Sequence, residues 1–337
     1  MKRLFLPLLT LLLTPLALLA DDYPTVGKVT KLDPALDELI APDAKIEKLC
    51  EGFTWAEGPV WKEGVLLFSD VPENTIYRWA PGMQKAEVFL TPSGLLAPKK
   101  GFPTDGSNGL TLDAEGRLIM CQHGERRIAR IEADRSQAAI VSAFEGKRFN
   151  SPNDLAIRRN GDIYFTDPPY GLDRLDDSPL KELKFNGVFR FSADGKLTVL
   201  IKDLKFPNGI AFSPNEKTLY IGSTDLLDPF IEAYDVQADG SVANPRRFFD
   251  ARKLSNVGVD GLCDGMKVDA KGNLFATGPK GVLVISPEGK HLGTISTGTL
   301  IANCGWGDDG STLYLTAEHT LCRIHTLTKG DRFPAGK

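Results

Sequence analysis

Short apolar runs alternate with polar turns along most of the chain from Ile46 onward. The runs are rich in Val, Ile, Leu, Phe and Tyr and have the length of strands rather than helices. Many of the turns open on a polar residue and close on Gly, which is typical of β-hairpins. The five clearest turns are Asp113–Gly116, Ser192–Gly195, Gln237–Gly240, Asp269–Gly272 and Ser286–Gly289. No stretch of helical length keeps an apolar period of 3.6, so the pattern predicts an all-β domain.

The same pattern is an internal repeat of six copies. Each copy begins with a polar residue at the head of an apolar strand, and a Gly turn leads to a second strand that ends on a small or acidic residue. The opening polar residues are Glu57, Asn108, Asn153, Asn208, Asp264 and Asn303. Repeats of about 40–50 residues with four strands each are the sequence signature of propeller blades. We therefore predict a six-bladed β-propeller over residues 45–330, since a pair of β-sandwiches would not repeat the polar cluster.

Two segments precede the first copy. Residues 21–44 are polar with little periodicity, and we expect them to form an N-terminal arm. Lys45–Phe53 has the composition of a strand but no partner in the first copy. It could supply the outer strand of the last blade, beside Thr320–His325. That pairing would close the ring.

The N-terminus has a different character. A basic start at Lys2 precedes an apolar stretch, Leu4–Leu19, and Ala20 stands before two aspartates. This order is typical of a secretory signal peptide, here residues 1–20. The stretch is short for a transmembrane helix, which needs about 20 apolar residues, although an uncleaved anchor is the alternative. We expect an exported protein, periplasmic or secreted, that is free of the membrane after cleavage.

Five cysteines are too few and too irregularly spaced for a disulfide scaffold, and none form a CxxC pair. Export permits a disulfide. Ring closure would bring Cys50 near Cys322, while Cys263 and Cys304 take equivalent places in adjacent blades. Either pair could form a bridge, and buried free thiols are the alternative.

Composition narrows the range of partners. The 337 residues carry a net charge of −4, with 42% hydrophobic and 25% charged residues, as in a soluble globular protein. An acidic balance without basic runs gives no general attraction to nucleic acid. A small-molecule partner is therefore favoured over nucleic acid. Composition leaves the oligomeric state open.

The repeat also predicts a metal site. The innermost strands of a propeller converge on a central channel, so the six opening residues should face one another. An Asn before Gly is by itself usually a turn former. Two carboxylates, Glu57 and Asp264, would repel each other in a narrow pocket unless a cation lay between them. Carboxylate and amide oxygens favour a hard ion such as Ca²⁺ or Mg²⁺, although Mn²⁺ and Zn²⁺ are not excluded.

Other catalytic chemistries have little support in the sequence. GxSxG, HExxH, Walker and helix-opening GxGxxG motifs are absent. Among four histidines, His123 directly follows an inner strand and is a candidate pocket residue. A hydrogen-bonded structural histidine is the alternative interpretation.

Several stretches together resemble the family of senescence marker protein (regucalcin) and gluconolactonase, particularly its bacterial gluconolactonase branch. The resemblance extends from about Ile46 to Arg323. It rests on Glu57–Trp61, Ser107–Asp113, His123–Arg127, Arg148–Asp154, Thr166–Gly171, Pro207–Gly209, Asp264–Asp269 and Asn303–Trp306.

The resemblance implies a six-bladed propeller with one divalent ion in its channel, Ca²⁺ above all, and hydrolysis of a gluconolactone-type sugar lactone. The implied metal ligands are Glu57, Asn153, Asn208 and Asp264, with Asp264 also the general base. Asn150 competes with Asn153, because animal members have a shorter Arg-x-Asn-Asp-Gly in this segment.

The implied substrate-binding residues are Asn108, His123, Arg148 and Asn153, and Tyr170 and Trp306 could form walls of the pocket. Two other functions use the same site. One is hydrolysis of organophosphates or other lactones, and the other is sugar or metal binding without catalysis.

Overall fold

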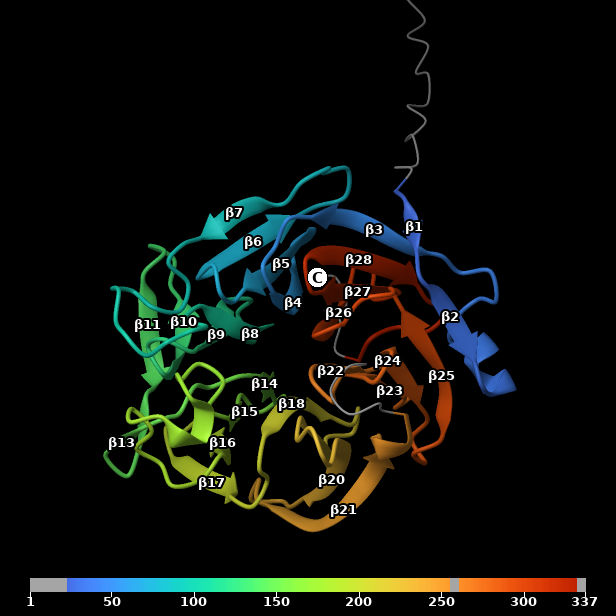
Figure 1. Cartoon of the computed structure of the whole chain (residues 1–337). Helices are drawn as coiled ribbons and strands as arrows, with labels where there is room; N and C mark the ends of the chain where they lie inside the picture. The colour runs from blue at the N-terminus through green and yellow to red at the C-terminus, as the bar shows by residue number, and fades with distance from the viewer. Residues whose placement is uncertain (1–22, 255–260, 332–337) are drawn as a thin grey trace, which may run out of the picture.

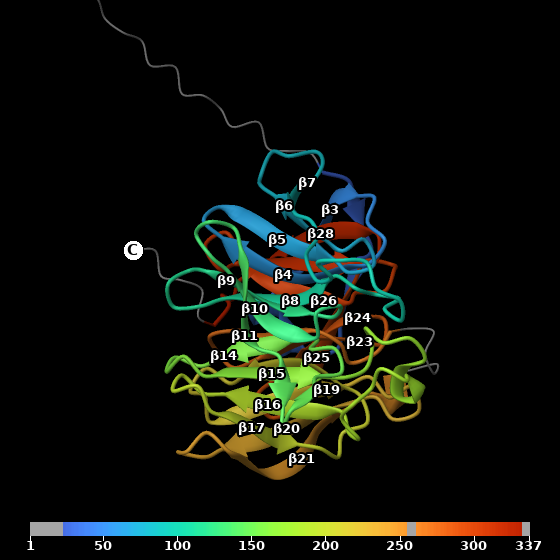
Figure 2. The same cartoon turned by 90° about the vertical axis from the view of Figure 1, so that its left-hand side faces the viewer.

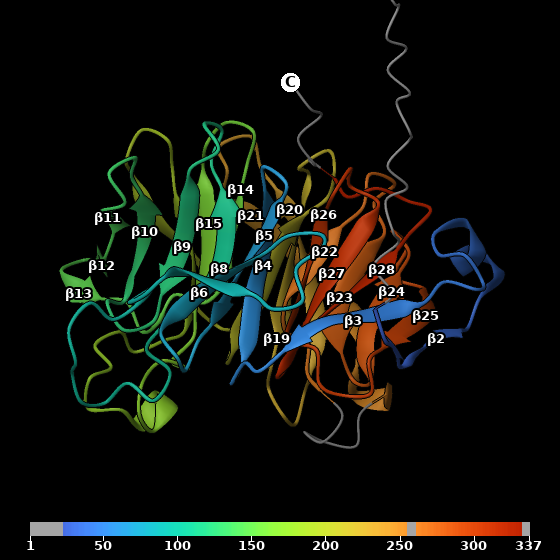
Figure 3. The same cartoon turned by 90° about the horizontal axis from the view of Figure 1, so that it is seen from above.

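The computed structural model describes residues 23–254 and 261–331, so the predicted signal peptide lies outside the described residues. Six antiparallel sheets surround a common axis, and their strands follow one another from the axis to the rim (Figure 1). Views at right angles show the sheets standing side by side as blades (Figures 2 and 3). The predicted six-bladed propeller is confirmed.

Blades 1 to 4 each consist of four consecutive strands. Blade 1 contains β4 (Ala56–Lys62), β5 (Val65–Asp70), β6 (Thr75–Trp79) and β7 (Glu87–Leu90). Blade 2 contains β8 (Ser107–Leu112), β9 (Leu118–Gln122), β10 (Arg127–Ile131) and β11 (Gln137–Val141). A hairpin follows, formed by β12 (Ala143–Phe144) and β13 (Lys147–Arg148). Blade 3 contains β14 (Leu155–Ile157), β15 (Ile163–Asp167), β16 (Gly187–Phe191) and β17 (Leu197–Ile201). Blade 4 contains β18 (Pro207–Phe212), β19 (Thr218–Ser223), β20 (Phe230–Val236) and β21 (Val242–Asp250).

Blades 5 and 6 also take strands from the N-terminal part of the chain. Blade 5 contains β22 (Met266–Val268), β23 (Leu274–Gly278), β24 (Gly281–Ile285), β25 (His291–Ser296) and, outermost, β2 (Lys28–Lys31). Blade 6 contains β26 (Asn303–Gly307), β27 (Thr312–Ala317), β28 (Thr320–His325), β3 (Ile46–Glu51) and β1 (Thr25–Val26). In the described part of the chain, three short 3₁₀ helices complete the elements: η1 (Pro34–Glu38), η2 (Leu175–Asp177) and η3 (Arg252–Leu254). Within these residues no helix has the length and apolar character needed to cross a membrane.

The ring closes as the sequence predicts. Strand β3 pairs antiparallel with β28, with Ile46 opposite Ile324. The stretch predicted as an arm contributes more than expected, because β1 and β2 lie in it and Leu36 of η1 is buried in the core. The four residues of β2 expose most of their side chains, so their sequence carries no apolar run that would mark a strand.

The five predicted turns form as expected. In each turn the closing Gly donates its backbone N–H to the carbonyl of the opening residue, for example Gly116 N to Asp113 O at 2.9 Å and Gly195 N to Ser192 O at 2.8 Å. The closing glycines have φ values between +74° and +88°. Other residues are strained in this left-handed region, which explains why Gly recurs at the fourth position.

The core is divided into six apolar clusters, one between each pair of neighbouring blades. Strand β19 shows why the strands are apolar on both faces: Leu219 and Ile221 pack toward blade 3, while Tyr220 between them packs toward blade 5. Side chains of a strand alternate between its two faces, and here both faces are buried.

Neither of the two possible disulfides forms, and all five cysteines are free and buried. Cys50 is paired with Leu321, so both side chains face the cluster between blades 6 and 1. Cys322 therefore points to the opposite face, into the cluster between blades 5 and 6. Cys263 and Cys304 are likewise divided between the clusters on the two sides of blade 5.

We expect reducing agent to change neither the intact mass nor the melting temperature of the purified protein, because no disulfide constrains the folded or unfolded chain. Electrospray mass spectrometry under denaturing conditions and a thermal scan, each with and without reductant, measure both quantities. A gain of two hydrogens on reduction would contradict the free thiols.

Candidate active site in the central channel

The innermost strands bring their polar residues to one rim of the channel. In β4, β8 and β18 the pairing register shifts near the start of the strand. The shifts lie between Glu57 and Val60, between Ser107 and Leu110, and between Pro207 and Ile210. Such bulges turn a side chain away from the regular alternation. They give Glu57, Asn108 and Asn208 their common place at the head of an inner strand.

Glycines follow these polar residues because neighbouring blades approach closely there. A Cβ atom on Gly109 would lie 2.6 Å from Asp154 Oδ1, and one on Gly209 would lie 2.0 Å from the carbonyl oxygen of Asp264. The N–H of Gly109 donates to the carbonyl of Asn153 in the next blade at 2.8 Å. Each Asn–Gly pair is therefore a contact between blades and lies at the bulge of its strand, not in a turn.

Hydrogen bonds join the predicted side chains into a partial ring. Asn108 Nδ2 donates to Asn153 Oδ1 at 2.8 Å, and Asn153 Nδ2 donates to Asn208 Oδ1 at 2.5 Å. His123 Nε2 lies 3.3 Å from Asn153 Oδ1. On the other side of the channel, Asn303 Nδ2 donates to Glu57 Oε2 at 3.1 Å.

A cavity of 440 Å³ opens above this ring. Six predicted side chains line it, and they come from five blades: Glu57, Asn108, His123, Asn153, Asn208 and Asp264. Nine further residues form its other walls, and among them only Tyr170 was expected from the sequence. They are Trp55, Val71, Thr104, Tyr170, Leu175, Phe206, Thr224, Leu226 and Leu262.

Burial strongly affects the ionisable groups of this cavity. It raises the pKa of Glu57 and of Asp264, and the charge of Glu57 raises the pKa of Asp264 further. Burial lowers the pKa of His123 to about 4, so its imidazole is neutral near pH 7. The site therefore combines two mutually repelling carboxylates with neutral hydrogen-bonding groups.

The donor set fits a hard divalent cation. Glu57 and Asp264 would supply two carboxylates, and Asn153 and Asn208 would supply amide oxygens, the ligands that Ca²⁺ and Mg²⁺ prefer. Asn108 Oδ1 is buried and has no hydrogen-bond partner among residues 23–254 and 261–331, which leaves one more polar oxygen beside this group. In the described ranges no three His, Cys, Asp or Glu side chains converge as a metal cluster, so the asparagine amides would have to complete the coordination.

Arg148, which we expected to bind substrate, is not among the residues that line the cavity. Arg148 lies at the end of β13, in the hairpin outside blade 3, and its guanidinium donates to the carbonyl of Glu125 at 2.7 Å. Its backbone N–H donates to Glu182 Oε2 at 2.8 Å. Both contacts keep the residue away from the residues that line the cavity.

Two further questions from the sequence are answered by geometry. Asn150 is fully buried and donates to the carbonyls of Asp167 and Phe185, so Asn153 and not Asn150 lines the cavity. Tyr170 is a wall residue, with its hydroxyl against Thr224 Oγ1. Trp306 is not, because it packs on Phe275 at the other end of the channel.

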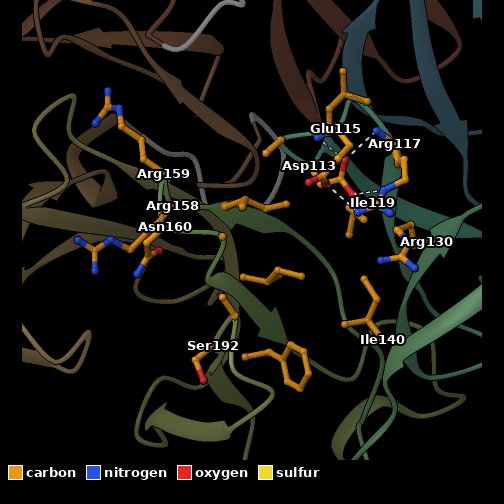
Figure 4. A pocket seen from close by; sticks show the side chains of 17 residues that line it. Asp113, Glu115, Arg117, Ile119, Arg130, Ile140, Arg158, Arg159, Asn160 and Ser192 are labelled. Atoms are coloured by element: carbon orange, nitrogen blue, oxygen red, sulfur yellow. Dashed lines mark hydrogen bonds and ion pairs between the residues drawn. The ribbon is translucent and has the colours of Figure 1, made fainter.

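A larger hollow of 740 Å³ lies at the opposite rim, between blades 2 and 3 (Figure 4). Its walls come from hairpin turns and the strands beside them. Arg117 pairs with Asp113 inside the hollow at 2.7 Å, and Arg158 pairs at 3.3 Å with Glu216, which lies outside its lining. None of the predicted site residues lines it. The chemistry of the chain is concentrated in the central cavity.

Comparison with known proteins shows the family of this chain. The protein-family model that describes the SMP-30/gluconolactonase/LRE-like region matches residues 55–319. A gluconolactonase from Zymomonas mobilis is 41% identical over 91% of this chain and 88% of its own length. The pentonolactonase XacC from Haloferax volcanii is 23% identical over 77% of this chain and 80% of its own. The solved structure of a gluconolactonase from Xanthomonas campestris has a TM-score of 0.78 at 31% identity and covers 91% of this chain and 98% of that one. The chain therefore belongs to the SMP-30/gluconolactonase/LRE-like family.

Proposed function

We propose that this enzyme is a lactone hydrolase that opens a gluconolactone-type sugar lactone at a divalent ion held in its central channel. The observation that carries the proposal is the convergence of two carboxylates, three asparagines and a neutral histidine in one cavity. The 41% identity to a gluconolactonase supports the lactone as substrate.

In this proposal Asp264 is the general base. Burial and the charge of Glu57 raise the pKa of its carboxyl, and a carboxylate with a raised pKa accepts a proton more readily. We assign to Asp264 the proton released by the attacking water. A bound divalent ion would polarise the lactone carbonyl and stabilise negative charge on its oxygen.

Neutral groups of the cavity would bind and orient the sugar. Asn108 and His123 can hydrogen-bond hydroxyl groups without adding charge, since burial keeps His123 unprotonated near pH 7. Trp55 and Phe206 offer flat apolar surfaces for the C–H faces of a sugar ring. This mixture suits a neutral polyhydroxy lactone and not a highly charged substrate.

Removal of the ion tests the proposed function. We expect protein dialysed against chelator to release acid from glucono-δ-lactone only at the spontaneous rate, and to recover on addition of Ca²⁺, Mg²⁺, Mn²⁺ or Zn²⁺. A pH-indicator assay with protein-free blanks measures the rate. Full activity after verified metal removal would contradict the ion, whereas an inactive protein that still binds the ion would favour a binding protein or another ester substrate.

A further inference from the structure

A lysine lies in the channel below the candidate site. Lys267 stands in the innermost strand of blade 5, three residues after Asp264, and lines the end of the channel opposite the cavity. It is half-buried. Its ammonium donates to the carbonyl of Met266 at 3.0 Å and to Asn303 Oδ1 at 3.4 Å.

Asn303 connects this lysine to Glu57. Its Oδ1 atom accepts from Lys267 and from the N–H of Cys304 at 2.9 Å, so its amide nitrogen is the group that faces Glu57 Oε2. A Cβ atom on Gly265 would lie 2.0 Å from Asn303 Cγ, so the amide lies flat against the glycine. Gly58 N also donates to Glu57 Oε2 at 2.9 Å, which leaves the second oxygen of Glu57 available for an ion.

The lysine also changes the charge balance of the channel. Three carboxylates, from Glu57, Asp154 and Asp264, influence one another there, and Asp154 Oδ2 is buried without a hydrogen-bond partner among the described residues. The ammonium of Lys267 is separated from the Glu57 carboxylate by the single amide of Asn303, which lies 3.4 Å from the first and 3.1 Å from the second. When all three carboxylates are ionised, their charges and that of the ammonium sum to −2, which one bound divalent ion neutralises.

We propose that Lys267 is the resident cation of the channel: it balances one of the three carboxylates, so that the site is matched to one divalent ion, and it orients Asn303 toward Glu57. Lys267 is thus a positioning residue that sets the charge preference of the ion site. This inference rests on the divalent-ion site of the proposed function.

The ratio of trivalent to divalent affinity tests the proposal. Tb³⁺ has nearly the size of Ca²⁺ and one more charge, and Trp55 in the cavity wall can sensitise its emission. Lys267→Met removes the repulsion between the ammonium and the bound cation. Because this repulsion is stronger for a trivalent ion, its loss favours Tb³⁺ more than Ca²⁺. We expect the ratio of the Ca²⁺ to the Tb³⁺ dissociation constant to rise roughly tenfold. Lys267→Arg should keep the ratio of the wild type. So should Lys329→Met, a surface lysine paired with Asp309.

A merely structural role for Lys267 would weaken both ions equally and leave the ratio unchanged, and that result would overturn the proposal. If Lys267→Met does not fold, Lys267→Gln, which keeps a hydrogen-bond donor but no charge, should give the same shift, and an unshifted ratio there overturns it too. Wild-type protein that binds neither ion would overturn the ion site together with this inference. If the wild type binds one equivalent of Ca²⁺ but the ratio of the two dissociation constants is unchanged in Lys267→Met and Lys267→Gln, this inference alone is overturned.

Discussion

The variant Asp264→Asn is expected to lose lactone hydrolysis and to bind the divalent ion more weakly than the wild type. The asparagine keeps the size of the side chain but cannot accept the proton of the attacking water, and loss of a general base typically costs a factor of about 10²–10⁴ in rate. Initial rates of acid release from glucono-δ-lactone, at ion concentrations that saturate each protein, separate the loss of the base from the loss of the ion.

The matched control is Asp228→Asn, because Asp228 is a partly exposed aspartate that pairs with Arg247 at 2.8 Å in blade 4. It should keep the wild-type rate. Full activity of Asp264→Asn at saturating ion would remove Asp264 from the mechanism. Loss of activity in both variants would point to a general effect of the substitution.

For Glu57→Gln we expect two effects of opposite sign. The affinity for Ca²⁺ should fall by roughly 100-fold, because one of two carboxylates is lost from the coordination group. The melting temperature of the ion-free protein should rise, because a buried charge that raises the pKa of Asp264 is removed. Calorimetric titration with Ca²⁺ and a thermal scan in chelator measure the two quantities.

The control for this variant is Glu63→Gln, which makes the same change of charge away from the channel. The side chain of Glu63 is 82% exposed. Both quantities should stay at their wild-type values there. A Glu57→Gln protein with unchanged Ca²⁺ affinity would show that Glu57 is not a ligand. An unchanged or lower melting temperature without ion would show that repulsion in the channel is weak.

The fold and the convergence of the site follow from one property of the sequence. A strand motif copied six times must place equivalent residues at equivalent points of a ring. The repeat therefore predicts that Glu57 and Asp264 lie in one site although they belong to different blades. Arg148 could not be placed this way, because the β12–β13 hairpin is not part of the repeat. Cys50 and Cys322 lie on adjacent strands as expected, yet the pairing of Cys50 with Leu321 sends their side chains to opposite faces.

The neighbours of Lys267 could not be predicted from the sequence either. A lysine in a short strand usually points to solvent, and only the convergence of the inner strands places this one beside Asn303. The cavity walls present the same difficulty. Phe206, Leu226 and Leu262 lie in segments between the repeated strands, where spacing gives no information about which residues face the axis.

The closure of the ring has a consequence for how the protein is made. Glu47 in β3 contacts Arg323 in β28 across 276 positions of the chain, so β3 cannot pair with this neighbour until β28 has been synthesised. Contacts of such long range slow folding and leave strand edges open in the meantime. Blade 6 can assemble only after β28 has been synthesised, and until then the ring of blades stays open.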